Sequence, residues 1–203
     1  IDSIVSKIGV EGSFLDSAEV VLLRKALDSV GSVVEFIQSR GEEGYPALWC
    51  KARGISSFPD IIRQIDNIID RFGEVKDSAS EELHQIRRSI REREGQAAKR
   101  LQQVLQAAKR AGIVEADAQL SVRDGKSVIP VSAANKRKLA GFIHDESATG
   151  RTFYVEPVEV VELNNELKEL EYAERREIVR ILTLLSEEIR PEAPLLEASG
   201  RYL

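Results

Sequence analysis

The sequence is acidic overall, with a net charge of −5, but one internal segment is rich in cations that could bind a ligand. Six lie within residues 123 to 151: Arg123, Lys126, Lys136, Arg137, Lys138 and Arg151. Because grouped cations hold the phosphate backbone of nucleic acid without reading its bases, the segment predicts a phosphate-binding site. No aromatic ladder interleaves the cations, which favours duplex or structured nucleic acid over stacking on single strands. The alternative is a basic hairpin whose charges serve solubility.

The residues that most often catalyse reactions or bind metals are scarce. Cys50, His84 and His144 are the only cysteine and histidines, which is too few for a structural zinc site. Asp145 and Glu146 follow His144 directly, but consecutive residues of a strand alternate between its two faces and do not converge. The sequence contains no G-x-x-x-x-G-K-[ST] motif for binding nucleotide phosphates. We therefore predict no catalytic, cofactor-binding or metal-binding residue in this chain.

The composition indicates a helical protein. Charged residues make up 31% of the 203 residues and aromatic residues 5%, a combination typical of long, exposed helices rather than of a β-sandwich, barrel or disulfide scaffold. The single cysteine, Cys50, fits a reducing compartment, and we expect it to be a small buried residue beside Trp49. No apolar run approaches the ~20 residues of a membrane span and no signal segment is present, so we expect a cytoplasmic protein. Because the chain begins at Ile1 and contains no methionine, we expect a piece of a longer product.

Short helices are predicted for the first part of the chain. Residues 16–19 have the spacing of a capping box, and apolar residues follow at helical intervals. Pro46 and Pro59 are placed to begin two further helices, because proline fits the first turn. Gly73 is expected to end the second of these. The pattern predicts a helical core region over residues 1–78.

Two long amphipathic helices are predicted on either side of the basic segment. Between residues 81 and 111, and again between 159 and 189, the seam residues are spaced 3, 4, 3, 4, 4, 3 and 4 apart. Such seams are typical of coiled-coil packing, and the doubled 4 is a stutter. Each seam contains one charged residue, Arg93 in the first and Glu174 in the second. When the seams are laid antiparallel, these two residues fall opposite each other. This coincidence predicts an ion pair that fixes the register of the two helices.

The connection between these helices has the pattern of a small antiparallel sheet. Residues 127–132, 141–144 and 152–155 are β-like runs, and residues 123–126 and 145–150 are turns. The predicted fold is therefore mainly α: a helical core piece and a long antiparallel two-helix lever arm with a small β clamp at its tip. The segments after the core region are an outgoing helix over 79–115, the clamp over 116–157, a returning helix over 158–190 and the start of a return to the core over 191–203.

Several ordered motifs of the chain resemble a known family. They are Gly73–Ser80 (GEVKDSAS), Val122–Gly125 (VRDG) with Ile129–Val131 (IPV), Gly141–Gly150 (GFIHDESATG), Val155–Pro157 (VEP) and Glu159–Leu167 (EVVELNNEL). Together they resemble the bacterial MutS-family paralogue of the MutS-two type. The likeness is strong over roughly residues 70–190 and looser over the first 70, which are similar to the helical core region of that family.

The resemblance implies a part of a modular ATPase. In that family a helical core leads into lever helices, and a clamp at the lever tip touches nucleic acid. An ABC-type ATPase domain that binds ATP and Mg and forms the main dimer contact follows, and then a nuclease-related domain. This chain would contain only core, lever and clamp, so we expect it to hydrolyse nothing and to be monomeric or weakly associated, although its parent would be a homodimer.

The resemblance also implies two targets for the parent protein. One is branched or mismatched DNA, where the family suppresses homologous recombination, and the other is the collided ribosome, which it senses and splits in the bacterial cytoplasm. A cationic tip does not choose between DNA and ribosomal RNA, because both present phosphates. The alternative function is a protein–protein interaction arm without direct nucleic-acid contact.

Overall fold

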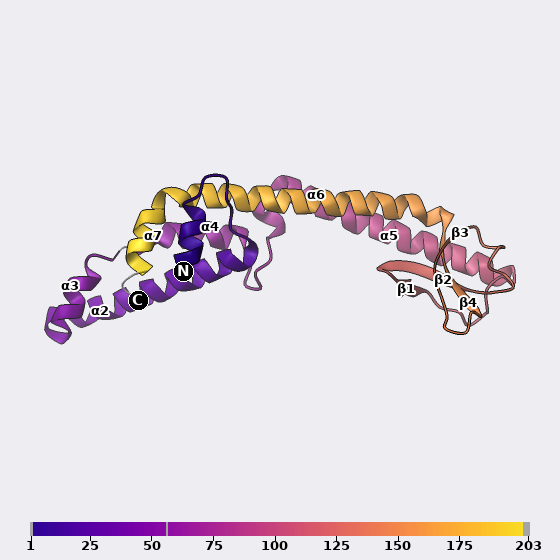
Figure 1. Ribbon diagram of the computed structural model, residues 1–203, viewed down its shortest axis with the longest axis horizontal. Coiled ribbons are helices and arrows are strands. Elements are labelled where there is room, and N and C mark those ends of the chain that lie inside the picture. The colour runs from indigo at the N-terminus through magenta and orange to yellow at the C-terminus, as the bar shows by residue number, and fades with distance from the viewer. Residues whose placement is uncertain (1, 56, 201–203) are drawn as a thin grey trace. The chain divides into compact units, whose positions relative to one another are not determined.

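The computed structural model describes residues 2–55 and 57–200, which divide into two compact units. The first unit comprises residues 1–85 and 174–203, and the second comprises residues 86–173. The described chain is mainly helical and contains a small antiparallel sheet, as predicted (Figure 1). Residues 201–203, at the end of the predicted return segment, lie outside the described residues, and the predicted division into five segments stays a prediction.

The elements follow the sequence pattern closely. The helices are α1 (Asp2–Ile8), α2 (Ser17–Gly44), α3 (Pro46–Ala52), α4 (Pro59–Ile68), α5 (Glu81–Arg110), α6 (Val158–Ile189) and α7 (Ala193–Gly200). Two short 3-10 helices occupy Asp77–Ala79 and Arg190–Glu192. The strands are β1 (Ser121–Arg123), β2 (Lys126–Ser132), β3 (Gly141–Glu146) and β4 (Thr152–Pro157). The strand β1 is absent from the prediction, which places only its last residue, Arg123, in a turn.

The first unit has one apolar core, to which α1, α2, α4 and α7 contribute together with the first turn of α5 and the end of α6. Leu83 of α5 and Leu185 of α6 are both fully enclosed in it. Ser80 caps α5, because its hydroxyl accepts a hydrogen bond from the backbone N–H of Leu83 (3.0 Å) and donates one to the Glu177 carboxylate (2.6 Å). This bond ties the beginning of α5 to α6 within the unit.

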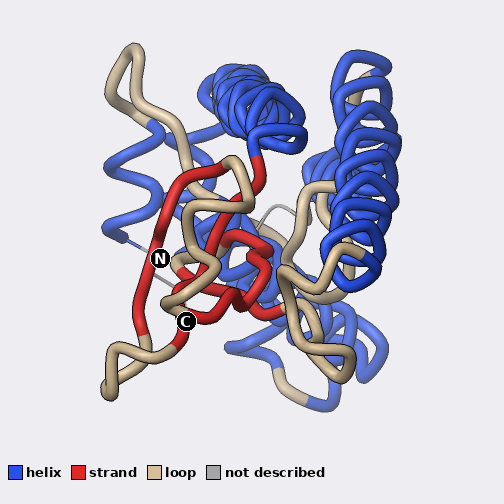
Figure 2. Tube along the Cα trace, turned by 90° about the vertical axis from the view of Figure 1, so that its right-hand side faces the viewer, coloured by secondary structure: helices blue, strands red, loops and turns tan. Residues whose placement is uncertain are grey.

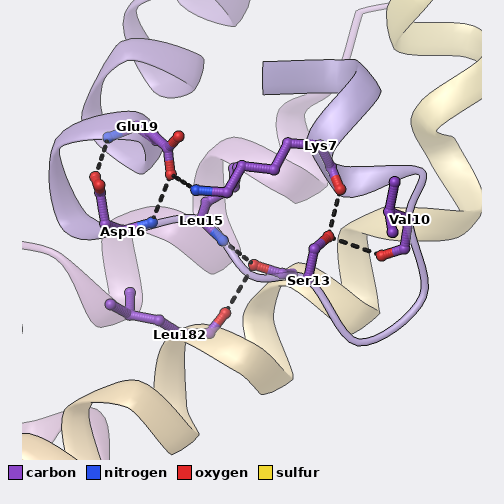
Figure 3. Close-up of polar contacts among 8 residues, drawn as sticks. Lys7, Val10, Ser13, Leu15, Asp16, Glu19 and Leu182 are labelled. Carbon is purple, nitrogen blue, oxygen red and sulfur yellow. Dashed lines mark hydrogen bonds and ion pairs between the residues drawn. The ribbon is translucent and has the colours of Figure 1, made fainter. Parts of the chain in front are cut away.

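The predicted capping box at the start of α2 is confirmed (Figure 3). The Asp16 carboxylate accepts from the backbone N–H of Glu19, and the Glu19 carboxylate accepts from that of Asp16, both at 2.9 Å. Lys7 of α1 pairs with Glu19 at 2.5 Å, so the box also joins α1 to α2. Leu15 donates its backbone N–H to the buried hydroxyl of Ser186 on α6 (2.9 Å), which holds the entry to α2 against that helix.

The prediction that Gly73 ends α4 is wrong, since the helix already ends at Ile68. The Asp70 carboxylate accepts the backbone N–H groups of Phe72 and Glu74 at 2.8 and 2.9 Å, which forms a local turn that competes with further helix. Ile69 is extended and forms an isolated antiparallel bridge with Val75.

The prediction that Cys50 is buried is also wrong. Cys50 is an exposed free thiol, and Ala52 is the buried residue of α3. The helix has only seven residues, so a single position suffices to seat it on its neighbour, α2, and Cys50 lies off that contact.

The second unit is built around a four-stranded sheet in the order β1-β2-β4-β3, with every neighbouring pair antiparallel. The strands are drawn in red in Figure 2. Ile129, Val131 and Val155 form the apolar side of the sheet. They pack with Leu101, Val104, Leu105 and Ala108 near the end of α5 and with Val160 near the start of α6. The sheet is therefore seated on the helical segments that lead into it and out of it.

The segments of α5 and α6 within the second unit run in opposite directions. Val160 at the start of α6 shares a core with the end of α5, whereas Arg93, earlier on α5, pairs with Glu166, later on α6, at 2.8 Å. Arg93 also donates to Gln96 at 2.8 Å. Glu174 belongs to the first unit, so the predicted pair between Arg93 and Glu174 stays a prediction.

Gly141 should not tolerate a side chain. A Cβ atom at this position would lie 2.3 Å from the carbonyl oxygen of Glu156 and 2.6 Å from Val155 Cγ1, which is closer than any ordinary contact. We expect Gly141→Ala to push β3 off β4 and to destabilise the second unit by about 2 kcal/mol or more in urea unfolding. Gly95→Ala is the control, because a Cβ there meets nothing within 4 Å and alanine should stabilise α5 by about 1 kcal/mol. Equal effects of the two changes would contradict this account.

Candidate nucleic-acid interface

Three segments of the second unit are joined by hydrogen bonds and form what we call the basic end: residues 109–113, 133–140 and 147–151. The Asn135 side-chain amide donates to the backbone carbonyl of Ile113 at 3.0 Å, which joins the first two segments. The backbone N–H of Ala133 donates to the carbonyl of Arg151 at 2.8 Å, which joins the second to the third. The three segments contain no acidic residue and six cations: Lys109, Arg110, Lys136, Arg137, Lys138 and Arg151.

The cations of the basic end are presented to solvent on a fixed backbone. Arg137, Lys138 and Arg151 are exposed, and within the described residues none of their side chains forms an ion pair or hydrogen bond. Lys136 lies over the ring of Phe153, with Nζ 4.0 Å from the centroid, so its stem is ordered while its charge meets no acid. The backbone N–H of Lys138 donates to the carbonyl of Asn135 at 2.8 Å, which closes the turn that carries all three consecutive cations.

A buried carboxylate holds the sheet of the second unit together. Glu156 of β4 is 1% exposed. It accepts from Lys126 of β2 (2.9 Å), interacts with the His144 ring of β3 (2.5 Å) and accepts from Asn164 of α6 (2.5 Å). Burial by itself would raise the pKa of Glu156, but hydrogen bonds from Lys126, Asn164 and His144 outweigh it and lower that pKa below its ordinary value. The carboxylate therefore stays ionised and ties three strands and a helix together.

The relatives of the chain align with nearly its whole length. Endonuclease MutS2 of Pelotomaculum thermopropionicum is 35% identical over 189 residues, 93% of this chain. The protein of the same name from Thermomicrobium roseum is 38% identical over 184 residues, and that from Lacticaseibacillus paracasei is 30% identical over 204 residues, the full chain. This chain is of the MutS2 type. It spans about a quarter of the length of these relatives, 24%, 23% and 26% in turn. No protein-family profile matches it.

Two of the cations predicted to bind phosphate lie outside the basic end, in the sheet of the second unit, and have acidic partners. Arg123 pairs with Asp145 at 2.9 Å and lies over the ring of Tyr154, 3.8 Å from its centroid. Lys126 pairs with Glu156 and begins β2, about 20 Å of strand away from Ser132, where the basic end starts. The structure thus gathers four of the six predicted cations and gives the other two contacts within the sheet. Their phosphate contacts stay a prediction.

Two cations of the basic end were not among the predicted site residues. Lys109 and Arg110 form the last turn of α5, where cations are usual because they complement the negative end of the helix dipole. Because this role explains both cations, the sequence gives no reason to assign them to a phosphate-binding site. The hydrogen bonds from Asn135 to the turn after α5 and the packing of Leu139 in one core with Ala108 bring them next to the loop at 133–140, and sequence spacing carries no sign of these contacts.

The stretch of α6 within the second unit is acidic. Between residues 158 and 173 this helix carries five glutamates and one cation, Lys168, which pairs with Glu171 at 3.1 Å. The basic end and this stretch of α6 therefore differ in the sign of their charge, and such a contrast favours a polyanion at the basic end over one along α6. Within the described residues there is no helix able to cross a membrane and no cluster of three His, Cys, Asp or Glu side chains that could hold a metal.

Proposed function

We propose that the second unit of this MutS2-type chain binds nucleic acid through its phosphates at the basic end, without reading bases. The observation that carries the proposal is the meeting of six cations and no acid in three segments that hydrogen bonds join. Three of these cations are exposed and have no protein partner among the described residues. Guanidinium and ammonium groups of this kind donate readily to phosphate oxygens.

Several features support duplex or structured nucleic acid as the ligand. Stacking on single strands needs accessible aromatic faces, whereas the three segments of the basic end contain no aromatic residue and the neighbouring ring of Phe153 has Lys136 over it. Lys136, Arg137 and Lys138 lie on a loop and not on a helix or β-ribbon that could enter a groove. We therefore expect their contacts to fall on the phosphate backbone.

We further propose that this chain is the core, lever and clamp part of a longer homodimeric protein. Its relatives carry the name endonuclease and are about four times as long. In this proposal the rest of that protein binds ATP and Mg, hydrolyses ATP and carries a nuclease-related domain. The clamp then contacts branched or mismatched DNA, or ribosomal RNA on collided ribosomes, in the bacterial cytoplasm.

Salt dependence tests the proposed phosphate contacts. Each phosphate that the protein neutralises steepens the log–log plot of duplex affinity against salt by about 0.9. We expect Lys136→Ala, Arg137→Ala and Lys138→Ala together to flatten the slope of the 203-residue chain by about 2 to 3, equally for unrelated sequences. The control changes Arg63, Arg88 and Lys168, three exposed cations in ion pairs on α4, α5 and α6, to alanine. An unchanged slope, or a loss that depends on base sequence, would contradict the proposal.

The competing function is a protein-interaction arm, and one observation favours it. Val122 on β1 is 62% exposed, and Phe142 and Ile143 on β3 are 58% and 52% exposed. Both strands are edges of the sheet. Exposed apolar edge strands are common docking sites for other chains. If this is the function, Phe142→Ser should abolish partner binding, while the triple change in the basic loop should leave it intact.

A further inference from the structure

The outer face of α5 carries a stripe that we call the outer stripe. Its five residues are exposed and follow one another at intervals of 3, 4, 3 and 4: Gln96, Lys99, Gln103, Gln106 and Arg110. These intervals place them in one row along an α-helix, about 21 Å long. The opposite face of the same segment, Leu101, Leu105 and Ala108, is buried against the sheet. The row therefore points away from the core of the second unit.

The charge around the outer stripe is one-sided. From residue 95 to residue 114 the chain has four cations and no acid. A merely solvated helix face usually mixes signs, as the same helix does one turn earlier, where Arg88 pairs with Glu92 at 3.0 Å. One acid from another element, Glu159, lines a shallow cavity of about 430 Å³ together with Arg100 and Gln103. Gln103 belongs to the stripe, whereas Arg100 lies beside the row and is not counted in it.

We infer that the outer stripe is a second phosphate-contact surface, along which a nucleic-acid duplex lies after leaving the basic end. Arg110 belongs to both surfaces, so the two are continuous. The inference rests on the proposed function, since it extends the same site along the helix. It assigns a ligand contact to the side chains of Lys99, Gln103 and Gln106.

The dimensions of the stripe suit a duplex. Lys99 and Arg110 are separated by about 16 Å of helix, a length over which one strand of a duplex presents about five phosphates. The glutamines between the two cations carry amide groups, which donate hydrogen bonds to phosphate oxygens as arginine and lysine do. No exposed aromatic residue interrupts the row, so bases gain nothing by stacking there. A single strand would lack the fixed phosphate spacing that such a row matches.

Charge insertion in the middle of the stripe tests the inference. Gln103→Glu with Gln106→Glu changes the charge of the 203-residue chain by two units without removing a cation of the basic end. We expect this pair of changes to weaken binding of a duplex of about 20 base pairs at least about tenfold, because juxtaposed like charges are strongly unfavourable. Lys99→Gln alone should flatten the salt slope by about 0.9. The matched control, Asn165→Asp with Lys168→Gln, changes the charge equally on α6 and should leave affinity within about twofold.

The outcomes separate this inference from the proposed function. If the basic-loop variant weakens duplex binding but both stripe variants bind like the control, the inference fails and the proposed function stands. If the stripe variants weaken binding and the basic-loop variant does not, the stripe stands and the basic end loses its assignment. If the unaltered chain binds no DNA or RNA duplex, both fail. Circular dichroism establishes that each variant keeps its helices, and Lys99→Gln, which leaves all the glutamines in place, provides the test should the double glutamate variant unfold.

Discussion

Replacing Glu156 with alanine should destabilise the second unit by about 3 kcal/mol, at the lower end of the cost of breaking a buried ion pair. The change leaves Lys126, His144 and Asn164 without the carboxylate that all three contact. Lys126 is partly exposed and can regain water, which places the expected cost at the lower end. Urea unfolding followed by amide signals of β2 and β4 measures it. Glu162→Ala, at an exposed glutamate of α6, should change the stability by less than about 0.5 kcal/mol.

Acid should remove the same stability from the unaltered chain. Because the pKa of Glu156 is lowered in the folded state, its contribution is present above the ordinary value of 4.5 and is lost as the pH falls through the folded pKa. Glu156→Gln should flatten this acid limb for signals of the sheet. Asp66, held by Arg24, and Glu177, held by Arg180, also have lowered pKa values, so the first unit should keep its own acid dependence. A sheet whose acid stability is the same with and without Glu156 would contradict the role given to it.

Reversing the three unpartnered cations of the basic end should nearly abolish duplex binding. Arg137→Glu, Lys138→Glu and Arg151→Glu each remove one phosphate contact and add a repulsive charge, while the packing of Lys136 on Phe153 is left intact. Three contacts are worth about 500-fold in affinity at about 0.1 M salt, so the triple reversal should cost about a thousandfold or more. Fluorescence anisotropy with a labelled duplex measures this loss.

The control for this reversal changes the same amount of charge at other sites. Arg63→Glu, Arg88→Glu and Lys168→Glu alter three exposed cations that already have acidic partners. If this control weakens binding as much as the reversal at the basic end does, affinity follows net charge and no local site exists. Stability should change little in either variant, since all six positions are exposed.

The helices that were predicted correctly depend on signals that are local in the sequence. The capping box at Asp16, the prolines at 46 and 59 and the long periodic seams all act within a few residues, and the corresponding helices begin where these signals stand. The end of α4 was misplaced because Gly73 was a plausible stop, whereas the side chain of Asp70 formed a turn three residues earlier.

The site was harder to predict, because it depends on contacts between distant segments. A count of cations along the chain treats Arg123 and Arg137 alike, yet Asp145 meets only the first of them. The acids that engage Arg123 and Lys126 come from β3 and β4, and their approach depends on strand order. In the same way, Lys109 and Arg110 join the basic end only through the loop that Asn135 anchors.

Position-specific crosslinking tests the central claim, phosphate contact at the basic end, most directly. With the native thiol removed by Cys50→Ser, a photoactivatable group can be attached at Arg137→Cys, or at Asn165→Cys on the acidic helix as the comparison. The account predicts that position 137 captures duplexes of unrelated sequence, that rising salt suppresses the capture and that position 165 captures little. Equal capture at both positions, or capture at 165 alone, would contradict it.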